Sequence, residues 1–460
     1  MKTGIITFLL SLWAVASACG AEVPRYIFYF IGDGMGMGQV QAAQVYNRTV
    51  LGNDEPLLMM QFPVASQSTT HSASSPVTDS AAAGTALATG HKTNNGMLGM
   101  TPDSAAVTSV AKELFDRGYG VALVTSVPPD DATPGAFYAH VPSRSMYYEI
   151  GLQAYDFIAG SKLRGTKDKD GNPNDLIDTF RANGVDIARG LDQLKDKKSR
   201  RVLLLNPEEI TESQINFTID SVKGAMNLPD MTLAALEHLK RNGRDRFFMM
   251  VEGGNIDYGG HANDGGTIIK EVINFNQALR HAYDFYLAHP DETLILVTAD
   301  HETGGMGLGN NSVGYDLHLR YIDWQRISKD RFADYCRAMR RSRRIYDWAD
   351  MKEFLEERMG FWHAVPVTDE QTASLEQEFE RCFKGELPAD KHTLYNSFNT
   401  FTEMVYRVQD SVTGLGFTTN GHSGGLVPVY AVGVGSELFM PLTDNALLPA
   451  RIRTICGLEQ

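Results

Sequence analysis

Short apolar runs that end in polar, glycine-rich loops recur along this chain of 460 residues. Such runs are typical of strands that are buried on both faces of a parallel sheet. The segments with this pattern are Tyr26–Ile31, Val121–Thr125, Arg201–Leu205, Phe247–Val251 and Leu294–Thr298. The hydrophobic pattern therefore predicts a set of buried strands, each followed by a loop.

Between these runs, apolar residues recur at spacings of three and four, which is typical of amphipathic helices. The helical segments are 107–117, 231–241 and 268–287. Strands that alternate with helices predict a three-layer α/β/α sandwich around a central, mostly parallel sheet. In such sheets, ligands bind beyond the carboxyl ends of the strands.

Two stretches differ from this pattern. Residues 311–400 are rich in aromatic, arginine and glutamate residues and look helical, so we interpret them as an insertion that forms a cap over the site. Residues 150–225 are interpreted as a second, smaller insertion. The chain is then one α/β domain, residues 19–460, that carries both insertions.

The formal net charge is −14, which argues against general nucleic-acid binding and predicts no nucleic-acid module. An anionic substrate is still compatible with this charge, because bound metal cations can reverse the local field.

The first 18 residues are predicted to be a signal peptide. Lys2 precedes the apolar run 5–18, which ends in Ala16-Ser17-Ala18, a small-residue cleavage pattern. The sequence therefore predicts a periplasmic or secreted protein. One alternative is an N-terminal membrane anchor, although the run is shorter than the roughly 20 residues that a span needs. The other alternative is a lipoprotein anchored through Cys19. No later segment is predicted to span a membrane.

Export permits disulfide bonds, and three cysteines lie in the body of the chain. Cys336 and Cys382 are the favoured pair because both lie in the stretch 311–400, and Cys456 lies outside it.

Asp79-Ser80 precedes a run of strong helix formers, Ala81–Ala88, with Gly90 as the expected stop. Read alone, the pair is an ordinary helix N-cap. A serine at a helix N-terminus is also placed among backbone N–H groups that can bind an anion, and it becomes a nucleophile if a base or metal lowers its pKa.

Several carboxylates and histidines follow the predicted strands at spacings that suit metal binding. They are Asp33, then Glu252, Asp257 and His261, then Asp300 and His301, and finally His422. Sets that contain histidine suit Zn²⁺, whereas a set of carboxylate and hydroxyl oxygens suits Mg²⁺. Each segment is a weak signal, but together they predict a metal-activated serine.

At this point the chain resembles the alkaline phosphatase family, whose motifs occur here in family order. They are Gly32-Asp33-Gly34-Met35-Gly36, Thr78-Asp79-Ser80-Ala81-Ala82, Asp131-Ala132-Thr133-Pro134, Ala139 to Arg144, Val251-Glu252-Gly253-Gly254 through Asp257 and His261, Thr298-Ala299-Asp300-His301 and Gly421-His422-Ser423-Gly424.

This resemblance implies an exported alkaline phosphatase that hydrolyses small phosphate monoesters, with two zinc ions and one magnesium ion, and it suggests a homodimer. Ser80 is the implied nucleophile and Arg144 the implied phosphate clamp. The implied ligand sets are Asp257, His261 and His422 for one zinc, Asp33, Asp300 and His301 for the other, and Asp33, Thr133 and Glu252 for magnesium.

One position departs from the family pattern. The residue after the metal-binding Asp257 is often Lys or His in the family, and here it is Tyr258. We therefore expect Asp131 to lack a cationic neighbour at this place, with effects on the magnesium site and the pH optimum.

Two other functions are weighed against this one. A sulfatase would need a Cys/Ser-x-Pro-x-Arg motif, which the residues after Ser80 do not provide, and a phosphodiesterase would cleave diesters faster than monoesters. A non-catalytic binder of zinc or phosphate would have no need of a serine at the focus of the metal ligands.

Overall fold

The computed structural model describes residues 23–151, 155–208, 210, 215–342, 346–384, 391–392 and 397–458. The predicted signal peptide and Cys19 lie outside the described residues. Within them, no helix has the length and apolar character to cross a membrane.

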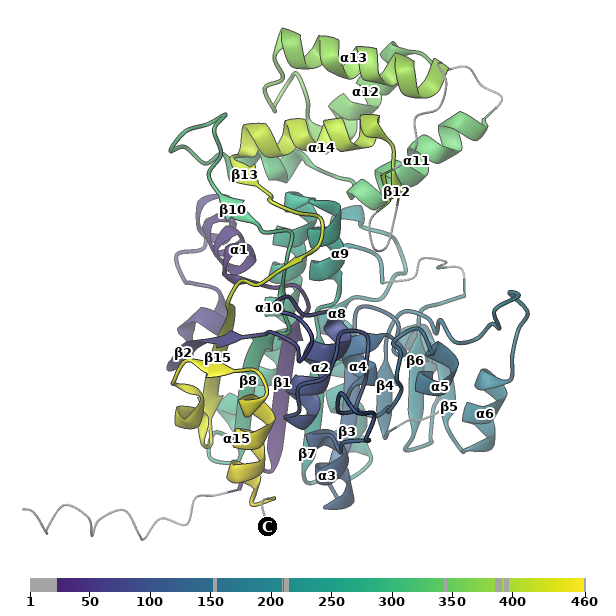
Figure 1. Cartoon of the computed structure of the whole chain (residues 1–460), viewed down its shortest axis with the longest axis vertical. Coiled ribbons are helices and arrows are strands. Elements are labelled where there is room, and N and C mark those ends of the chain that lie inside the picture. The colour runs from purple at the N-terminus through teal and green to yellow at the C-terminus, as the bar shows by residue number, and fades with distance from the viewer. Residues whose placement is uncertain are drawn as a thin grey trace, which may run out of the picture.

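A ten-stranded sheet forms the centre of the molecule (Figure 1). Its strands in spatial order are β16 (Thr443–Asp444), β2 (Val64–Thr69), β15 (Val427–Gly433), β8 (Thr293–Ala299), β1 (Tyr26–Gly32), β7 (Phe247–Glu252), β3 (Gly120–Thr125), β4 (Phe157–Ala159), β6 (Val202–Leu205) and β5 (Asp186–Arg189). β15 is antiparallel to both its neighbours, and the other pairs are parallel.

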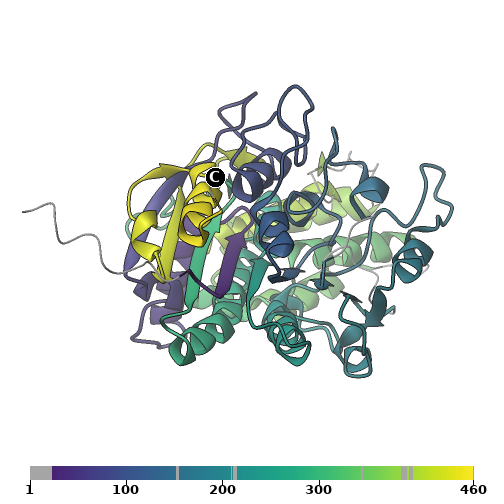
Figure 2. The ribbon, with the colours of Figure 1, turned by 90° about the horizontal axis from the view of Figure 1, so that it is seen from below.

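Helices cover both faces of this sheet (Figure 2). On β1, Phe28 and Phe30 pack in one hydrophobic layer, whereas Ile27, Tyr29 and Ile31 pack in the other. The first layer is covered by α1 (Met37–Thr49), α7 (Gly190–Leu194), α8 (Leu228–Arg241) and α10 (Gly265–Ala288). The second is covered by α2 (Ser80–Thr89), α3 (Val110–Asp116), α6 (Leu176–Ala182) and α15 (Leu447–Cys456).

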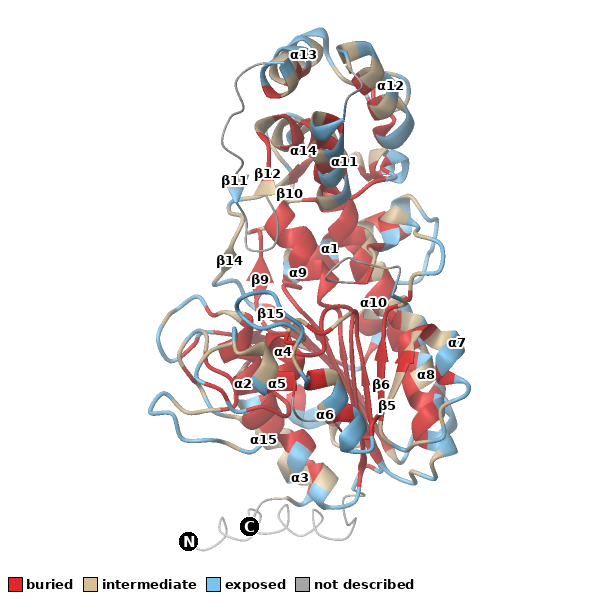
Figure 3. Ribbon diagram, turned by 90° about the vertical axis from the view of Figure 1, so that its right-hand side faces the viewer, coloured by how far each residue is buried: buried red, intermediate tan, exposed pale blue. Residues whose placement is uncertain are grey.

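The central strands are buried along their length (Figure 3), which explains why they are apolar at every position instead of alternating. The predicted three-layer α/β/α fold is confirmed. The short elements at the carboxyl ends of the strands are α4 (Ala132–Gly135), α5 (Tyr147–Gly151) and α9 (Asn255–Ala262), and single 3₁₀ turns occur at Leu58–Gln61, Thr218–Asp220 (η2) and Ser436–Phe439.

A second group of helices lies above the carboxyl edge of the sheet (Figure 1). It consists of the 3₁₀ helix Leu319–Trp324, α11 (Lys329–Arg341), α12 (Trp348–Met359), α13 (Asp369–Lys384) and α14 (Thr400–Thr413), with a hydrophobic cluster of its own. Short strand pairs are associated with it: β10 (Gly307–Leu308) with β13 (Leu415–Gly416), and β11 (Lys391–His392) with β12 (Ser397–Phe398).

The two stretches interpreted as insertions are built differently from each other. Residues 150–225 contribute β4, β5 and β6 to the edge of the central sheet, whereas residues 311–400 supply most of the upper helices. Their standing as insertions in a single domain stays a prediction.

The expected disulfide between Cys336 and Cys382 is absent. Both residues are buried in the same hydrophobic cluster, but both are free thiols, as is Cys456. Their sulfur atoms have separate neighbours: Cys336 Sγ lies 3.8 Å from Thr402 Oγ1, and Cys382 Sγ lies 3.3 Å from Glu378 Oε1.

Candidate active site

The predicted ligands meet at the carboxyl edge of the sheet. Asp33 follows β1, Glu252 ends β7, and Asp300 follows β8, and these three strands are neighbours in parallel register. Because the side chains leave adjacent strands at the same level, segments far apart in the sequence converge. All three carboxylates are buried.

His422 reaches the same edge by a different route, since it precedes a strand. β15 runs antiparallel to β8, so its beginning lies beside the end of β8. The two-residue strand β14 (His422–Ser423) also pairs with β9 (Glu302–Thr303), which directly follows His301. The antiparallel strand therefore explains how a histidine before β15 joins ligands that come after β1, β7 and β8.

Ser80 is the first residue of α2 and is 1 % exposed. Asp79 caps the helix by accepting a hydrogen bond from the Ala82 N–H at 3.0 Å. Ser80 Oγ lies 3.2 Å from His301 Nε2, which places the hydroxyl against the ligand cluster. The serine therefore has both surroundings that the sequence suggested, a capped helix N-terminus and the candidate metal ligands.

The ligand atoms form two compact groups. In one, Asp33, Asp300 and His301 each present an atom within 4.8 Å of the others, and His301 Nε2 lies 3.4 Å from Asp33 Oδ1 and 3.2 Å from Asp300 Oδ2. This group is the set implied for the zinc beside Ser80.

The other group contains Asp257, His301 and His422. His261 lies against it, because its Nε2 is 3.4 Å from Asp257 Oδ2 and 3.1 Å from His422 Nε2. The His301 and His422 rings stack with their centroids 3.6 Å apart. His301 therefore lies between the two implied zinc sets, in contact with both.

An observation that does not depend on the residue types also indicates that this site is suited to metal ions. Four buried oxygen atoms make no hydrogen bond of ordinary geometry with any described residue: Asp33 Oδ1, Asp300 Oδ2, Glu252 Oε1 and Thr133 Oγ1. Leaving such atoms unsatisfied in the interior is costly, and a cation would remove that cost. They include oxygens of all three residues implied for magnesium.

The acid–base properties of the cluster lead to the same conclusion. Burial, together with repulsion among neighbouring carboxylates, raises the pKa of Glu252 to about 8, that of Asp300 to about 7 and that of Asp33 well above its usual range. Burial acts in the same direction on Asp257, but the adjacent histidines outweigh it and lower its pKa. Carboxylates packed with so little positive charge are typical of a site built for cations.

Arg144 approaches the site from the loop before α5. Its guanidinium lies 3.4 Å from Asp79 Oδ2 through Nη1 and 3.2 Å from Asp131 Oδ1 through Nη2, and its side chain is 20 % exposed. Because Asp79 directly precedes Ser80, the arginine is held beside the hydroxyl that we expect to react.

Position 258 supplies no cation to Asp131, as expected, but another part of the chain does. Arg164 places its Nη2 3.3 Å from Asp131 Oδ2 and donates from the same atom to the Tyr258 hydroxyl at 2.6 Å. No pattern in the sequence pointed to this arginine, since it lies in a loop without a motif. Tyr258 therefore holds a cation beside Asp131 instead of supplying one.

Glu302 was also missed. Its buried carboxylate accepts hydrogen bonds from Gln39 Nε2 at 2.6 Å, from the Met306 N–H at 3.1 Å and from Ser423 Oγ. These bonds fix β9 against β14, and so fix His301 relative to His422. The feature of the sequence that could have identified Glu302 is its position directly after Asp300-His301.

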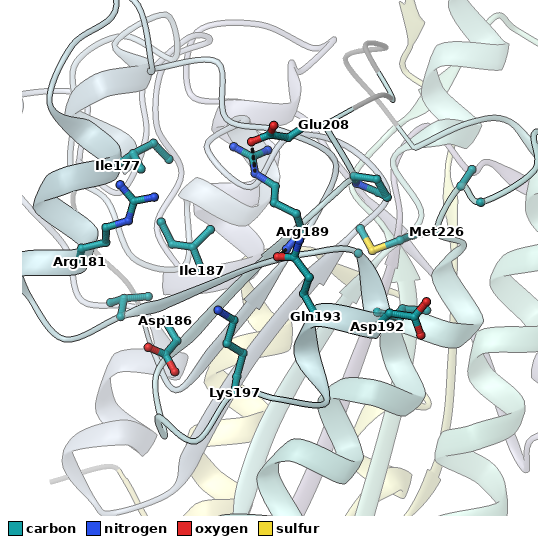
Figure 4. Close-up of a pocket in the computed structure, with 16 residues that line it drawn as sticks. Ile177, Arg181, Asp186, Ile187, Arg189, Asp192, Gln193, Lys197, Glu208 and Met226 are labelled. Carbon is teal, nitrogen blue, oxygen red and sulfur yellow. Dashed lines mark hydrogen bonds and ion pairs between the residues drawn. The ribbon is translucent and has the colours of Figure 1, made fainter.

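A cavity of about 1090 Å³ lies elsewhere, against the edge strand β5 (Figure 4). Basic side chains including Arg181, Arg189 and Lys197 line it, and Arg189 lies 3.9 Å from Glu208. None of the residues that we expect to do chemistry lines this cavity, so it contributes nothing to the site.

Comparison with known proteins gives consistent matches over nearly the whole chain. The family model described as alkaline phosphatase matches residues 25–162 and 156–458. Alkaline phosphatase 4 of Bacillus subtilis (strain 168) is 30 % identical over 439 residues, covering 92 % of this chain and 87 % of that protein. Alkaline phosphatase 3 of the same strain is 30 % identical over 432 residues, covering 92 % and 86 %.

Among solved structures, the cold-active alkaline phosphatase from the psychrophile Shewanella sp. is 26 % identical with a TM-score of 0.78. The match covers 94 % of this chain and 99 % of the Shewanella chain.

Proposed function

The chain belongs to the alkaline phosphatase family and is a hydrolase of phosphate monoesters, and from this premise we propose that it acts through a phosphoserine intermediate on Ser80. The observation that carries the proposal is the 3.2 Å contact between Ser80 Oγ and His301, at the point where both candidate ligand groups meet. A serine that served only as a helix residue would have no reason to face this cluster.

We propose that Asp257, His261 and His422 hold one zinc ion, that Asp33, Asp300 and His301 hold a second, and that Asp33, Thr133 and Glu252 hold magnesium. The unsatisfied oxygens and the mixture of imidazole and carboxylate donors support this division. When bound there, such ions act as Lewis acids that lower the pKa of a hydroxyl and offset negative charge on phosphoryl oxygens.

The residues of the chain then have separable tasks. Ser80 Oγ releases its proton to solvent and attacks phosphorus, a new P–O bond forms as the ester P–O bond breaks, and the leaving alkoxide takes a proton from water. A water molecule next attacks the serine phosphate, which breaks the P–Oγ bond, releases inorganic phosphate and restores the hydroxyl. Arg144 binds two non-bridging oxygens with its planar fork, and the N–H groups at the start of α2 face the same negative charge.

The test is Ser80→Ala, with Ser75→Ala on the preceding loop as the matched control. We expect Ser80→Ala to lower kcat for a nitrophenyl monoester by roughly three orders of magnitude or more, as loss of a nucleophile does elsewhere. The control should retain the activity of the wild type. Mass spectrometry of acid-quenched wild type should find phosphate on the peptide that contains Ser80.

Unchanged hydrolysis by a clean Ser80→Ala preparation would show that the phosphoserine mechanism is wrong. Faster cleavage of a nitrophenyl diester than of the monoester by the wild type would instead favour phosphodiester hydrolysis as the main activity.

We also propose export to the periplasm or the medium, on the basis of the signal pattern in residues 1–18. Cell fractionation and the mass of the mature N-terminus separate a free protein that has lost residues 1–18 from a lipoprotein anchored at Cys19. The suggested homodimer stays a prediction, and light scattering of the purified protein tests it.

A further inference from the structure

Arg164 is fixed in place by contacts on several sides. Its Nη2 donates to the Tyr258 hydroxyl at 2.6 Å, and its Nη1 donates to the Tyr147 hydroxyl at 3.0 Å. The guanidinium also lies over the Tyr147 ring, 5.3 Å from its centroid. Tyr258 is 4 % exposed and packs against Val127, so the hydroxyl that receives Arg164 has little room to move.

Asp131 connects this arginine to Arg144. Its Oδ1 lies 3.2 Å from Arg144 Nη2, and its Oδ2 lies 3.3 Å from Arg164 Nη2. The carboxylate is 5 % exposed, and the Ala132 N–H also donates to Oδ1 at 2.8 Å. The two guanidinium groups therefore share one buried carboxylate, with one oxygen atom each.

This division matters because arginine and carboxylate tend to pair through two parallel hydrogen bonds. With Oδ2 engaged by Arg164, Asp131 meets Arg144 through a single oxygen. Without Arg164, the carboxylate could rotate and bind Arg144 with both oxygens, which would draw the guanidinium away from a phosphoryl group.

We infer that Arg164 is a positioning residue for the phosphate clamp: held by Tyr258 and Tyr147, it engages Oδ2 of Asp131 and so keeps Arg144 oriented toward the phosphoryl group. This inference rests on the proposed role of Arg144. It also assigns a role to Tyr258: the residue at position 258 is uncharged, but its hydroxyl holds the Arg164 guanidinium beside Asp131.

The experiment is a double-mutant cycle on Arg164→Ala and Arg144→Ala, read as kcat/KM for a nitrophenyl monoester and as inhibition by inorganic phosphate. In the wild-type background, Arg164→Ala should lower kcat/KM by about tenfold to 100-fold, the range expected for a misplaced clamp. Phosphate should inhibit about tenfold more weakly. In the Arg144→Ala background, the same substitution should change either value by less than about twofold, because nothing remains to be positioned.

Matched variants separate positioning from general damage. Tyr258→Phe removes only the hydroxyl and should shift both readouts in the direction of Arg164→Ala, with no further effect when Arg164 is already alanine. Arg164→Lys keeps the charge on Asp131 and should recover part of the loss. Lys167→Ala removes an exposed positive charge three residues along the same loop and should leave both values at the wild-type level.

The inference is overturned if Arg164→Ala is neutral, or if its fold loss is the same with and without Arg144, since Arg164 would then act on the substrate directly. A fall in Tm for Lys167→Ala as large as that for Arg164→Ala would also overturn it. The lower kcat/KM of Arg164→Ala would then be explained by general destabilisation of the loop that carries both residues. If Arg144→Ala changes neither kcat/KM nor inhibition by phosphate, in contrast, the proposed clamp is refuted. That result can be distinguished from each of those above.

Discussion

At the scale of single residues, Glu271 shows how far a carboxyl group in this fold can depart from its usual acidity. It lies on α10 and is 5 % exposed, and it accepts a hydrogen bond from the Thr218 N–H at 2.6 Å. Burial raises its pKa to about 7. The folded state therefore binds a proton that the unfolded state releases at a pH near 4.3.

The pKa of Glu271 is higher in the folded state than in the unfolded state. The contribution of its proton to the free energy of unfolding is therefore complete below pH 4 and is lost as pH rises through 7. Glu271→Gln keeps an acceptor for Thr218 and does not titrate. We expect the variant to gain about 2 to 3 kcal/mol relative to the wild type between pH 5 and pH 8. Urea denaturation at the two pH values measures this, and an equal difference at both would contradict the raised pKa.

Residues of the site differ in how well the sequence predicted them. Asp33, Asp300 and His301 could be found because each directly follows an apolar strand, and parallel strands bring their carboxyl ends together. Arg164 could not be found, because no periodicity or motif fixes the loop that carries it. Its place beside Asp131 depends on Tyr258, which the sequence showed only as a missing cation.

At the scale of elements, the start of α2 combines a structural cap with a charged contact. Asp79 Oδ1 accepts from the Ala82 N–H at 3.0 Å, whereas Oδ2 accepts from the Gly96 N–H at 3.0 Å and lies 3.4 Å from Arg144 Nη1. One carboxylate therefore both begins the helix that presents Ser80 and holds the arginine beside it.

Substitutions at Asp79 separate these two tasks. Asn keeps an oxygen for the cap but loses the charged contact, and Ala loses both. We expect Asp79→Ala to be about 1 kcal/mol less stable than Asp79→Asn in thermal or urea denaturation. Both should bind inorganic phosphate more weakly, and to a similar extent, because Arg144 loses the same partner in each. Equal stability of the two variants would exclude a contribution from the cap.

The strands were the most predictable elements, since the predicted segments overlap β1, β3, β6, β7 and β8. Their continuous apolar runs leave few alternatives in an α/β chain. β15 was not predicted as antiparallel, because strand direction depends on pairing partners that local sequence does not specify.

At the scale of the whole molecule, the proposed metal ligands join parts of the chain that are otherwise linked mainly by the sheet. They come from the ends of β1, β7 and β8, from α4 and α9, and from β14. The upper helices join the same region through Lys329, whose buried Nζ lies 2.6 Å from Ala262 O and 3.0 Å from Glu403 Oε1. Ala262 directly follows His261.

Removal of metal should therefore destabilise the entire fold. A ligand that binds only the folded state, at a thousandfold excess over its Kd, stabilises it by about 4 kcal/mol. We expect prolonged chelation to lower Tm by several degrees, and zinc with magnesium to restore it. His422→Ala should show a smaller difference between the chelated and reloaded protein. A Tm that chelation does not change would argue against the ligand assignment.

The three-layer architecture was predictable because alternating strands and helices have few ways to bury their apolar faces. The arrangement of the upper helices was not, since amphipathic helices 12 to 16 residues long can pack in many ways. Of the edge strands that residues 150–225 supply, β6 was predicted, whereas β4 and β5 were not, because they are only 3 and 4 residues long.

The pairing of Arg164 with Tyr258 has an evolutionary consequence. The cation on Asp131 comes from a residue 94 positions away from Tyr258 in the sequence, so two related chains can present the same charge there without an identical residue at either position. A lysine at position 258 would place its ammonium against the Arg164 guanidinium. Because the two side chains are in contact, we expect the effect of a substitution at position 258 to depend on the residue at position 164.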